Sequence, residues 1–183
     1  MKINMKITGE RIYLRILTPE DVNKDYVEWL RDEEITQFLE IRWKVFTMEE
    51  IRGYVSLMNE SPDDFLFGIF LKGNNEHIGN IKVGEIDQMH RFGSVGLLIG
   101  NKNMWGKGYG TEAIRLATQY SFEEGNLNHL KAGMYSDNKG CYKAFIKAGY
   151  TEIGRYKNSR FYKGVFVDEI LMEKSRDREP YGE

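Results

Sequence analysis

The chain has 183 residues, of which 41% are hydrophobic and 30% charged, and its formal net charge is −2 at pH 7. This length and balance are typical of one globular domain with a sizeable core. The small negative charge argues against broad electrostatic binding to nucleic acid or to an anionic membrane. We predict a single domain over residues 1–174 and a polar C-terminal tail over residues 175–183.

The cysteine count and the hydropathy of the chain indicate which cellular compartment suits the protein. A lone cysteine, Cys141, excludes an internal disulfide framework and fits a reducing environment. The N-terminal residues lack a continuous apolar segment, and no later run approaches membrane-spanning length. We therefore expect a cytoplasmic protein with no membrane partner, and we expect no bound metal.

The first predicted elements are a strand and two helices. Residues 12–17 alternate imperfectly and predict a strand. Thr18-Pro-Glu-Asp21 predicts a helix start, because threonine caps, proline suits the first turn and acids favour the positive end. The capping box Thr47-Met-Glu-Glu50 predicts a helix to about Met58. The aromatic-rich connection over residues 35–46 either lines a substrate pocket or covers the core.

The rest of the chain is mostly strands around one central crossover. Residues 64–71 and 77–86 predict a hairpin, and residues 94–99 a further strand. A glycine-rich stretch then enters a helix that should end near Gly125-Asn126. The remaining predicted elements are a strand over 130–135, a helix over 142–147, and two strands between 150 and 172 with a turn near Asn158 or Ser159. This order predicts a mixed sheet with one βαβ crossover.

The glycine-rich stretch carries three glycines at alternate positions, Gly106, Gly108 and Gly110, directly before the helical pattern. Glycine lets backbone N–H groups approach a ligand closely, and a helix N-terminus adds unpaired N–H groups and partial positive charge. We expect an anion cradle that suits phosphate; the alternative is a flexible turn.

A dinucleotide-binding motif is a rival interpretation of this stretch. Gly108-Tyr-Gly110-Thr-Glu-Ala113 satisfies Gly-x-Gly-x-x-Ala, and Asp137 follows the next strand as a ribose-binding acid would. Residues 100–107, however, separate the motif from the preceding strand, and repeated βα units are absent. A dinucleotide-binding oxidoreductase therefore stays an alternative.

A second segment strengthens a different interpretation. Trp105-Gly-Lys-Gly108-Tyr-Gly110 matches Arg/Gln-x-x-Gly-x-Gly/Ala except that Trp105 replaces Arg or Gln. The segment from Asn138 to Tyr150 matches Asn-x-x-Ala/Ser-x-x-x-Tyr-x-Lys-x-Gly-Phe, with Cys141 at the small-residue position. Two such segments about thirty residues apart are more specific than one glycine motif. Together they resemble the GNAT acetyltransferase superfamily, and the resemblance covers nearly the whole chain.

Two sequence segments resemble one branch of this superfamily, and the resemblance implies a fold. Trp-Gly-Lys-Gly-Tyr and the opening Thr8-Gly-Glu-Arg-Ile-Tyr-Leu-Arg15 are similar to ribosomal-protein N-terminal and spermidine acetyltransferases. The implied fold class is α/β (α+β), a single-domain GNAT-like fold. Its mixed, mostly antiparallel sheet of about seven strands is flanked by helices. The sheet is splayed between its fourth and fifth strands, residues 94–99 and 130–135, to admit the pantetheine arm. A homodimer is compatible with this family.

The implied function is direct transfer of an acetyl group from acetyl-CoA, the co-substrate, to a primary amine. A small-molecule amine such as an amino sugar is the leading partner, with a protein N-terminus or a polyamine as alternatives. Five early acids keep the polyamine open: Glu33, Glu34, Glu40, Glu49 and Glu50. A CoA-binding module without catalysis is the alternative of another class.

The resemblance also implies which residues bind CoA. The glycine stretch should hold the pyrophosphate, the end of the fourth strand the pantetheine, and Asn138 should contact CoA while capping its helix. Lys107 either adds charge at the pyrophosphate or is a solvated loop lysine. For Lys147 we favour a role at the helix C-terminus over a contact with the nucleotide end of CoA. The expected residues are Leu97, Leu98, Ile99, Trp105, Gly106, Lys107, Gly108, Tyr109, Gly110, Thr111, Asn138 and Phe145.

The proton carriers are less defined. Phe145 stands where the family usually has a general-acid tyrosine, so Tyr142, three residues earlier on the same helix face, is a candidate substitute. Glu85 and Asp87 are candidate bases, acting directly or through water, and a solvated strand end is their alternative. A mechanism of positioning and oxyanion polarisation, with water removing the proton, is also open.

Overall fold

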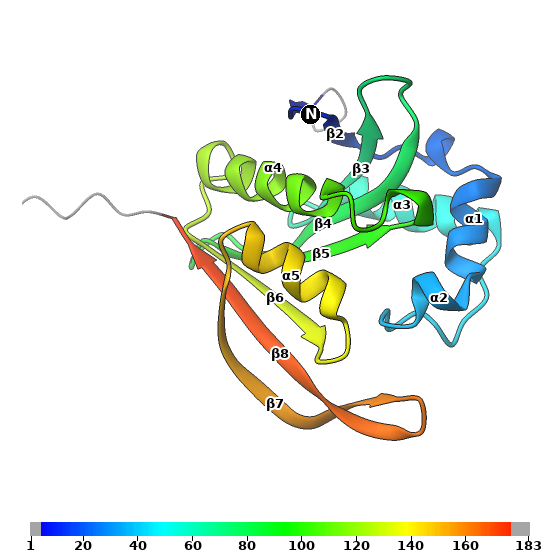
Figure 1. Cartoon of the computed structure of the whole chain (residues 1–183). Helices are drawn as coiled ribbons and strands as arrows, with labels where there is room; N and C mark the ends of the chain where they lie inside the picture. Colours follow the sequence, from blue (N-terminus) through cyan, green and yellow to red (C-terminus); the bar gives the residue numbers. More distant parts are fainter. Residues whose placement is uncertain (1–4, 177–183) are drawn as a thin grey trace, which may run out of the picture.

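A computed structural model of the chain describes residues 5–176. Its centre is a mixed sheet in the order β1-β2-β3-β4-β5-β6-β8-β7 (Figure 1). Neighbouring strands are antiparallel except for the parallel pair β5 and β6. The strands are β1 (Lys6–Thr8), β2 (Ile12–Ile16), β3 (Phe65–Leu71), β4 (His77–Asp87), β5 (Phe92–Ile99), β6 (His129–Tyr135), β7 (Thr151–Tyr162) and β8 (Val165–Ser175).

Five α-helices of the described region surround this sheet. They are α1 (Lys24–Arg31), α2 (Glu33–Thr36), α3 (Met48–Glu60), α4 (Tyr109–Glu123) and α5 (Lys139–Lys147). Short 3-10 turns occur at Pro19–Asp21 and Lys102–Met104. No helix within residues 5–176 is long and apolar enough to cross a membrane.

Strand β2 shows how both faces of the sheet are covered. Its residues Ile12, Leu14 and Ile16 are buried in a core that α4 and α5 complete. Tyr13 points to the opposite face, where its ring stacks on Phe70 at 5.3 Å in a second core with α1 and α3. Because successive strand residues face opposite sides, a strand buried on both faces is apolar almost throughout.

The two halves of the sheet separate at one place. Strands β5 and β6 pair only from Phe92 with His129 to Ser94 with Lys131. Beyond these pairs β5 continues along β4 to Ile99, while β6 continues along β8 to Tyr135. The strands therefore diverge as a V, and α5 lies beside the opening (Figure 1). The predicted splay between these strands is confirmed.

Two differences from the predicted elements lie near the N-terminus. A short edge strand, β1, brings the sheet to eight strands instead of about seven. The predicted helix start at Thr18 is wrong: Pro19–Asp21 forms only a 3-10 turn, after which Val22 is extended with φ −75° and ψ 97°. Helix α1 begins later, because the Asn23 side chain caps it by accepting a hydrogen bond from the backbone N–H of Tyr26.

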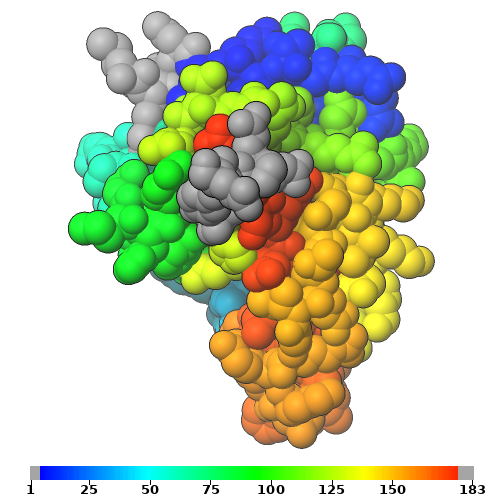
Figure 2. Space-filling model, turned by 90° about the vertical axis from the view of Figure 1, so that its left-hand side faces the viewer, coloured from blue at the N-terminus to red at the C-terminus, as the bar shows by residue number. Residues whose placement is uncertain are grey.

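The C-terminal hairpin also turns later than predicted. Its turn is Lys163-Gly164, both with positive φ (48° and 84°), as a two-residue hairpin turn requires. Asn158, in the predicted turn, instead sits in a bulge of β7 with φ 49°, where its N–H donates to Asp168 Oδ1. Figure 2 shows this long hairpin projecting beyond the rest of the molecule.

The segment after α5 is fixed to α4 by one buried hydrogen bond. The Tyr150 and Thr118 hydroxyls lie 2.8 Å apart, and both residues are at most 2% exposed. The Tyr150 ring also meets Phe145 edge-on at 4.9 Å between centroids. This contact holds the C-terminal end of α5 in place.

We expect Tyr150→Phe to lower the free energy of unfolding by about 1–2 kcal/mol, because the buried Thr118 hydroxyl loses its partner while the ring stays. Urea denaturation followed by circular dichroism measures this. The control is Tyr156→Phe on the exposed hairpin, which should change the free energy by less than about 0.5 kcal/mol. Equal effects of the two substitutions would contradict the assignment.

Candidate active site

The glycine-rich stretch forms the connection between β5 and α4. Gly108 is the N-cap of α4, with φ 85°, and Gly106 has φ 71°. Residues other than glycine rarely adopt such backbone angles, so the path of the loop requires glycine at these two positions. The first N–H groups of α4 lack helical partners and point towards the loop, which suits an anion.

An ion pair holds this loop against the start of β2. Arg11 Nε donates to Glu112 Oε2 at 2.9 Å, and Arg11 Nη1 donates to the Lys107 carbonyl at 2.9 Å. Glu112 Oε1 accepts from the backbone N–H groups of Arg11 and Ile12. Burial alone would raise the pKa of Glu112, but these hydrogen bonds and the guanidinium lower it. Glu112 therefore stays ionised at neutral pH and keeps the loop in position.

Trp105 gives the loop a second attachment. Its indole Nε1 donates to the carbonyl of Ile99 at 2.8 Å, at the end of β5. Gly110 packs closely on the same strand, since a Cβ there would lie 3.0 Å from Leu97 Cδ2. The residue that replaces the usual Arg or Gln of the motif thus links the loop to the strand at the V.

A cavity of about 580 Å³ lies between the loop, the end of β5 and one side of α5. All but two of the predicted cofactor-binding residues line it. These are Leu97, Leu98, Ile99, Trp105, Gly106, Gly108, Tyr109, Gly110, Thr111 and Asn138. We call this space the larger cavity.

Two predicted cofactor-binding residues, Lys107 and Phe145, do not line the larger cavity. Lys107 lines neither of the cavities described in this section, and its carbonyl is engaged by Arg11. Phe145 is 1% exposed and lines a second cavity instead. Asn138 combines both expected features, because its side chain accepts from Cys141 N at 3.1 Å as the cap of α5 and also lines the larger cavity.

Sequence reasoning missed part of this lining. Lys139, Lys143 and Lys147 project from α5 into the larger cavity, one helical turn apart. Their spacing of four was a usable signal, although we favoured a helix C-terminus for Lys147. Residues of α2 and the following loop also contribute, including Phe38 and Leu39, which belong to the aromatic-rich connection for which pocket lining was one of two interpretations.

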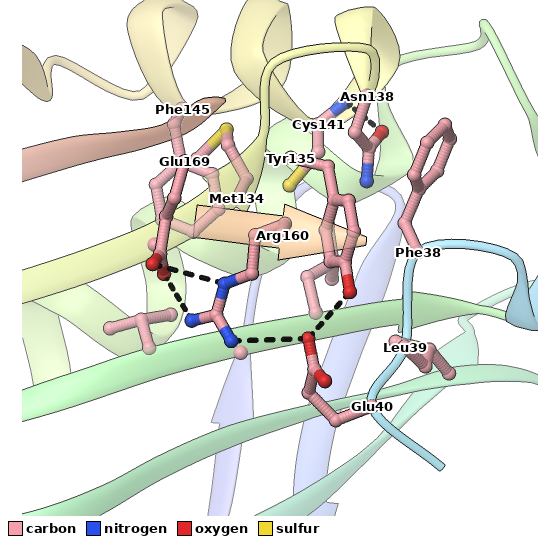
Figure 3. A pocket seen from close by; sticks show the side chains of 14 residues that line it. Phe38, Leu39, Glu40, Met134, Tyr135, Asn138, Cys141, Phe145, Arg160 and Glu169 are labelled. Atoms are coloured by element: carbon pink, nitrogen blue, oxygen red, sulfur yellow. Dashed lines mark hydrogen bonds and ion pairs between the residues drawn. The ribbon is translucent and has the colours of Figure 1, made fainter. Parts of the chain in front are cut away.

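The second cavity, of about 220 Å³, occupies the V itself (Figure 3). We call it the smaller cavity. Its walls come from β5, β6, α5, the loop after α2 and the β7–β8 hairpin. It adjoins the larger cavity, because both are lined by Phe38, Leu39, Leu97, Asn138 and Cys141. A ligand in one cavity would therefore reach a ligand in the other.

Charged side chains meet at the smaller cavity. Arg160 donates to both carboxylate oxygens of Glu169, from Nε at 3.0 Å and from Nη2 at 2.6 Å. Arg160 Nη1 lies 3.4 Å from Glu40 Oε1, which also accepts from the Tyr135 hydroxyl at 2.7 Å (Figure 3). The hydrogen bond to Glu169 raises the pKa of Arg160, and burial followed by Glu40 raises that of Tyr135.

The loop after α2 contacts the hairpin across the cavity. Tyr162 donates from its hydroxyl to Gln37 Oε1 at 2.7 Å, and Arg42 Nη2 donates to the Phe161 carbonyl at 2.7 Å. The Phe38 ring lies 5.0 Å from that of Tyr162, between centroids. These contacts settle the role of the aromatic-rich connection: it lines a pocket.

The three candidate proton carriers lie outside both cavities. Glu85 accepts from Ser94 Oγ at 2.7 Å, which with nearby Lys131 lowers its pKa. Asp87 accepts from the backbone of His90 at 2.7 Å in a turn. Tyr142 interacts with Glu152 instead. Their catalytic roles stay predictions, and this geometry does not support them.

Cys141 lines both cavities, but its thiol is not activated as a nucleophile. Burial raises the pKa of its thiol to about 12, so it is neutral at physiological pH. Within residues 5–176 no group of three or more His, Cys, Asp or Glu side chains could hold a metal ion.

Comparisons with known proteins agree with this geometry. The model of the acetyltransferase (GNAT) domain matches residues 11–151. An uncharacterized N-acetyltransferase, p20, of Bacillus licheniformis is 28% identical over 167 residues, covering 89% of this chain and 92% of the relative.

Two solved structures share the fold. One is a spermidine N-acetyltransferase from Vibrio cholerae in complex with CoA and spermine, with 20% identity, a TM-score of 0.81 and coverage of 91% and 96% of the two chains. The other is a ribosomal-protein-S5-alanine acetyltransferase from Vibrio fischeri, with 20% identity, a TM-score of 0.83 and coverage of 97% and 100%. Both come from the predicted branch, and the dinucleotide-binding interpretation is set aside. The chain belongs to the GNAT acetyltransferase family and is an N-acetyltransferase.

Proposed function

We propose that acetyl-CoA occupies the larger cavity and passes its acetyl group directly to a primary amine in the smaller cavity. The observation that carries this proposal is the junction of the two cavities where β5 and β6 diverge. The thioester would lie at this junction, beside Leu97 and Asn138, and the amine would approach from the hairpin side.

The pyrophosphate and the pantetheine of CoA each match groups of the protein that could bind them. The pyrophosphate suits the N–H groups of the loop and the N-terminus of α4, and the lysines of α5 add positive charge. Beyond Ser94, strand β5 has no strand partner on its β6 side. Its backbone N–H groups there are available to bind pantetheine and to polarise the acetyl carbonyl.

The acceptor that fits best is a small amine such as an amino sugar. A cavity of about 220 Å³ is below the roughly 300–1,000 Å³ of pockets for drug-sized ligands, so it admits an amine and the few atoms next to it. Phe38 and Tyr135 supply aromatic surface, and Glu40 supplies negative charge. A protein N-terminus is the second candidate, because only its first residue needs to enter.

The chemistry proposed for this site places few demands on side chains. Positioning brings the amine to the thioester, backbone N–H groups stabilise the oxyanion, and water removes the amine proton. Phe145 cannot donate a proton, which is consistent with such a mechanism.

The direct test is CoA release from acetyl-CoA with a panel of amino sugars, aminoglycosides, polyamines and short peptides. We expect turnover with at least one amino sugar and slower turnover with the others. Tight CoA binding without turnover on any amine would instead favour a CoA-binding module.

We expect Glu112→Gln to raise KM for acetyl-CoA roughly fivefold with little change in kcat, because about 1 kcal/mol of loop positioning is lost. Steady-state kinetics at a saturating amine concentration measure this. Glu123→Gln at the exposed end of α4 is the control and should leave KM unchanged. An unchanged KM for Glu112→Gln would show that the loop holds its shape without the ion pair.

We expect Cys141→Ala to retain kcat within about threefold, because a neutral thiol is a poor nucleophile. The wild-type thiol should react with iodoacetamide at pH 8 at least about a hundredfold more slowly than free cysteine, given a pKa of about 12. Alkylation at the rate of free cysteine, or loss of turnover in the variant, would show an active thiol.

A further inference from the structure

The charges of the smaller cavity limit what it can bind. Its lining holds three charged side chains, Glu40, Arg160 and Glu169, which together carry one net negative charge. Arg160 is committed to Glu169 through two hydrogen bonds, at 3.0 and 2.6 Å. Two of its five N–H donors are therefore occupied and a third faces Glu40, so an incoming carboxylate would meet the carboxylates of Glu169 and Glu40 beside the guanidinium.

A glycine on β6 helps to fix this ion pair. A Cβ on Gly133 would lie 2.5 Å from Glu169 Oε1, so any larger residue there would require the carboxylate to move from its present position over β6. The Glu169 side chain is 13% exposed. Breaking its ion pair with Arg160 would therefore cost free energy, because a largely buried carboxylate would lose its partner. The pair thus acts as a fixed wall of the cavity.

Glu40 is arranged differently. Its Oε1 accepts from Tyr135 and faces Arg160, while no donor within residues 5–176 is hydrogen-bonded to its Oε2. The side chain is 56% exposed, so a ligand can reach it. Its partners orient the carboxylate and leave one oxygen for a further donor.

Two further acids, Glu34 and Asp137, line the larger cavity, and Glu34 is already paired. Glu34 accepts from Lys102 Nζ at 2.7 Å, and that lysine also contacts Asp32 at 2.7 Å. Asp137 has no side-chain partner within residues 5–176, but it lines only the larger cavity, beside Lys139, where CoA is proposed to bind. In the smaller cavity, a second ammonium group on an acceptor would find no further unpaired carboxylate. The site offers one position for one positive charge.

We propose that Glu40 is the specificity-determining residue for the acceptor, that it selects primary amines with no carboxylate on the carbon that bears the amine, and that further positive charges on the acceptor do not strengthen binding. Its Oε2 accepts a hydrogen bond from the amine, in either the ammonium or the neutral form. Free amino acids are excluded because their carboxylate meets Glu40 and Glu169, and polyamines gain nothing from their additional charges. This inference rests on the acetyl transfer proposed above.

Alaninamide and alanine are a matched pair of probes, because they differ only in the carboxylate. Their binding to the protein saturated with CoA is measured by calorimetry, for wild type, Glu40→Gln and the control Glu49→Gln. Glu49 is exposed on α3 and lines neither cavity. Thermal unfolding of each variant verifies that it is folded.

We expect wild type to bind alaninamide at least about tenfold more tightly than alanine, and spermidine within about threefold of alaninamide. Glu40→Gln should weaken alaninamide binding about tenfold, as expected for loss of a charged hydrogen-bond partner, and Glu49→Gln should not. Equal binding of the two probes, an unchanged affinity in Glu40→Gln, or no alaninamide binding to wild type would each overturn the proposal.

Kinetics separate this proposal from the acetyl transfer itself. With turnover, Glu40→Gln should raise KM for the amine about tenfold and leave KM for acetyl-CoA unchanged. Selective binding without CoA release from acetyl-CoA would contradict the transfer and leave the role of Glu40 standing. Turnover that is equal in wild type and Glu40→Gln would contradict the role of Glu40 and leave the transfer standing.

Discussion

The parting of β5 and β6 after Ser94 and Lys131 is the constraint on which the rest of the structure depends. A continuous ladder would satisfy the backbone groups of both strands and leave no room between them. Because each strand pairs with a different neighbour beyond this point, β5 with β4 and β6 with β8, one edge of β5 lacks a strand partner. Both cavities meet in this gap, with α5 on one side and the hairpin on the other.

Two ion pairs keep the walls of the gap in place, and neither needs to take part in chemistry. Arg11 and Glu112 attach the glycine loop to β2 on the side of the larger cavity. Arg160 and Glu169 form a wall of the smaller cavity, where Gly133 makes room for the carboxylate. Both pairs are partly screened from water, where removing one partner costs more than at an exposed site. The fold thus separates the groups that shape the site from the backbone groups that would act on the thioester.

Local signals predicted the geometry of the glycine loop and of the start of α5 well. Positive backbone angles at Gly106 and Gly108 and the cap at Asn138 depend on neighbours in the chain, so the sequence patterns identified them. The smaller cavity depends on contacts between distant residues: Glu40 and Arg160 are 120 positions apart. No periodicity or motif links these two residues, so the sequence did not indicate that they meet. The late turn at Lys163-Gly164 was missed because the polar run around Asn158 is a bulge with similar composition.

In the proposed complex, CoA lies along the unpaired edge of β5 with its pyrophosphate at the glycine loop. Hydrogen–deuterium exchange of the backbone amides, with and without saturating CoA, tests this placement most directly. We expect slower exchange on CoA binding at residues 97–99 and 106–111 and at the start of α5, with little change in the β1–β2 pair. Protection confined to other parts of the chain, or none at residues 97–99, would contradict it.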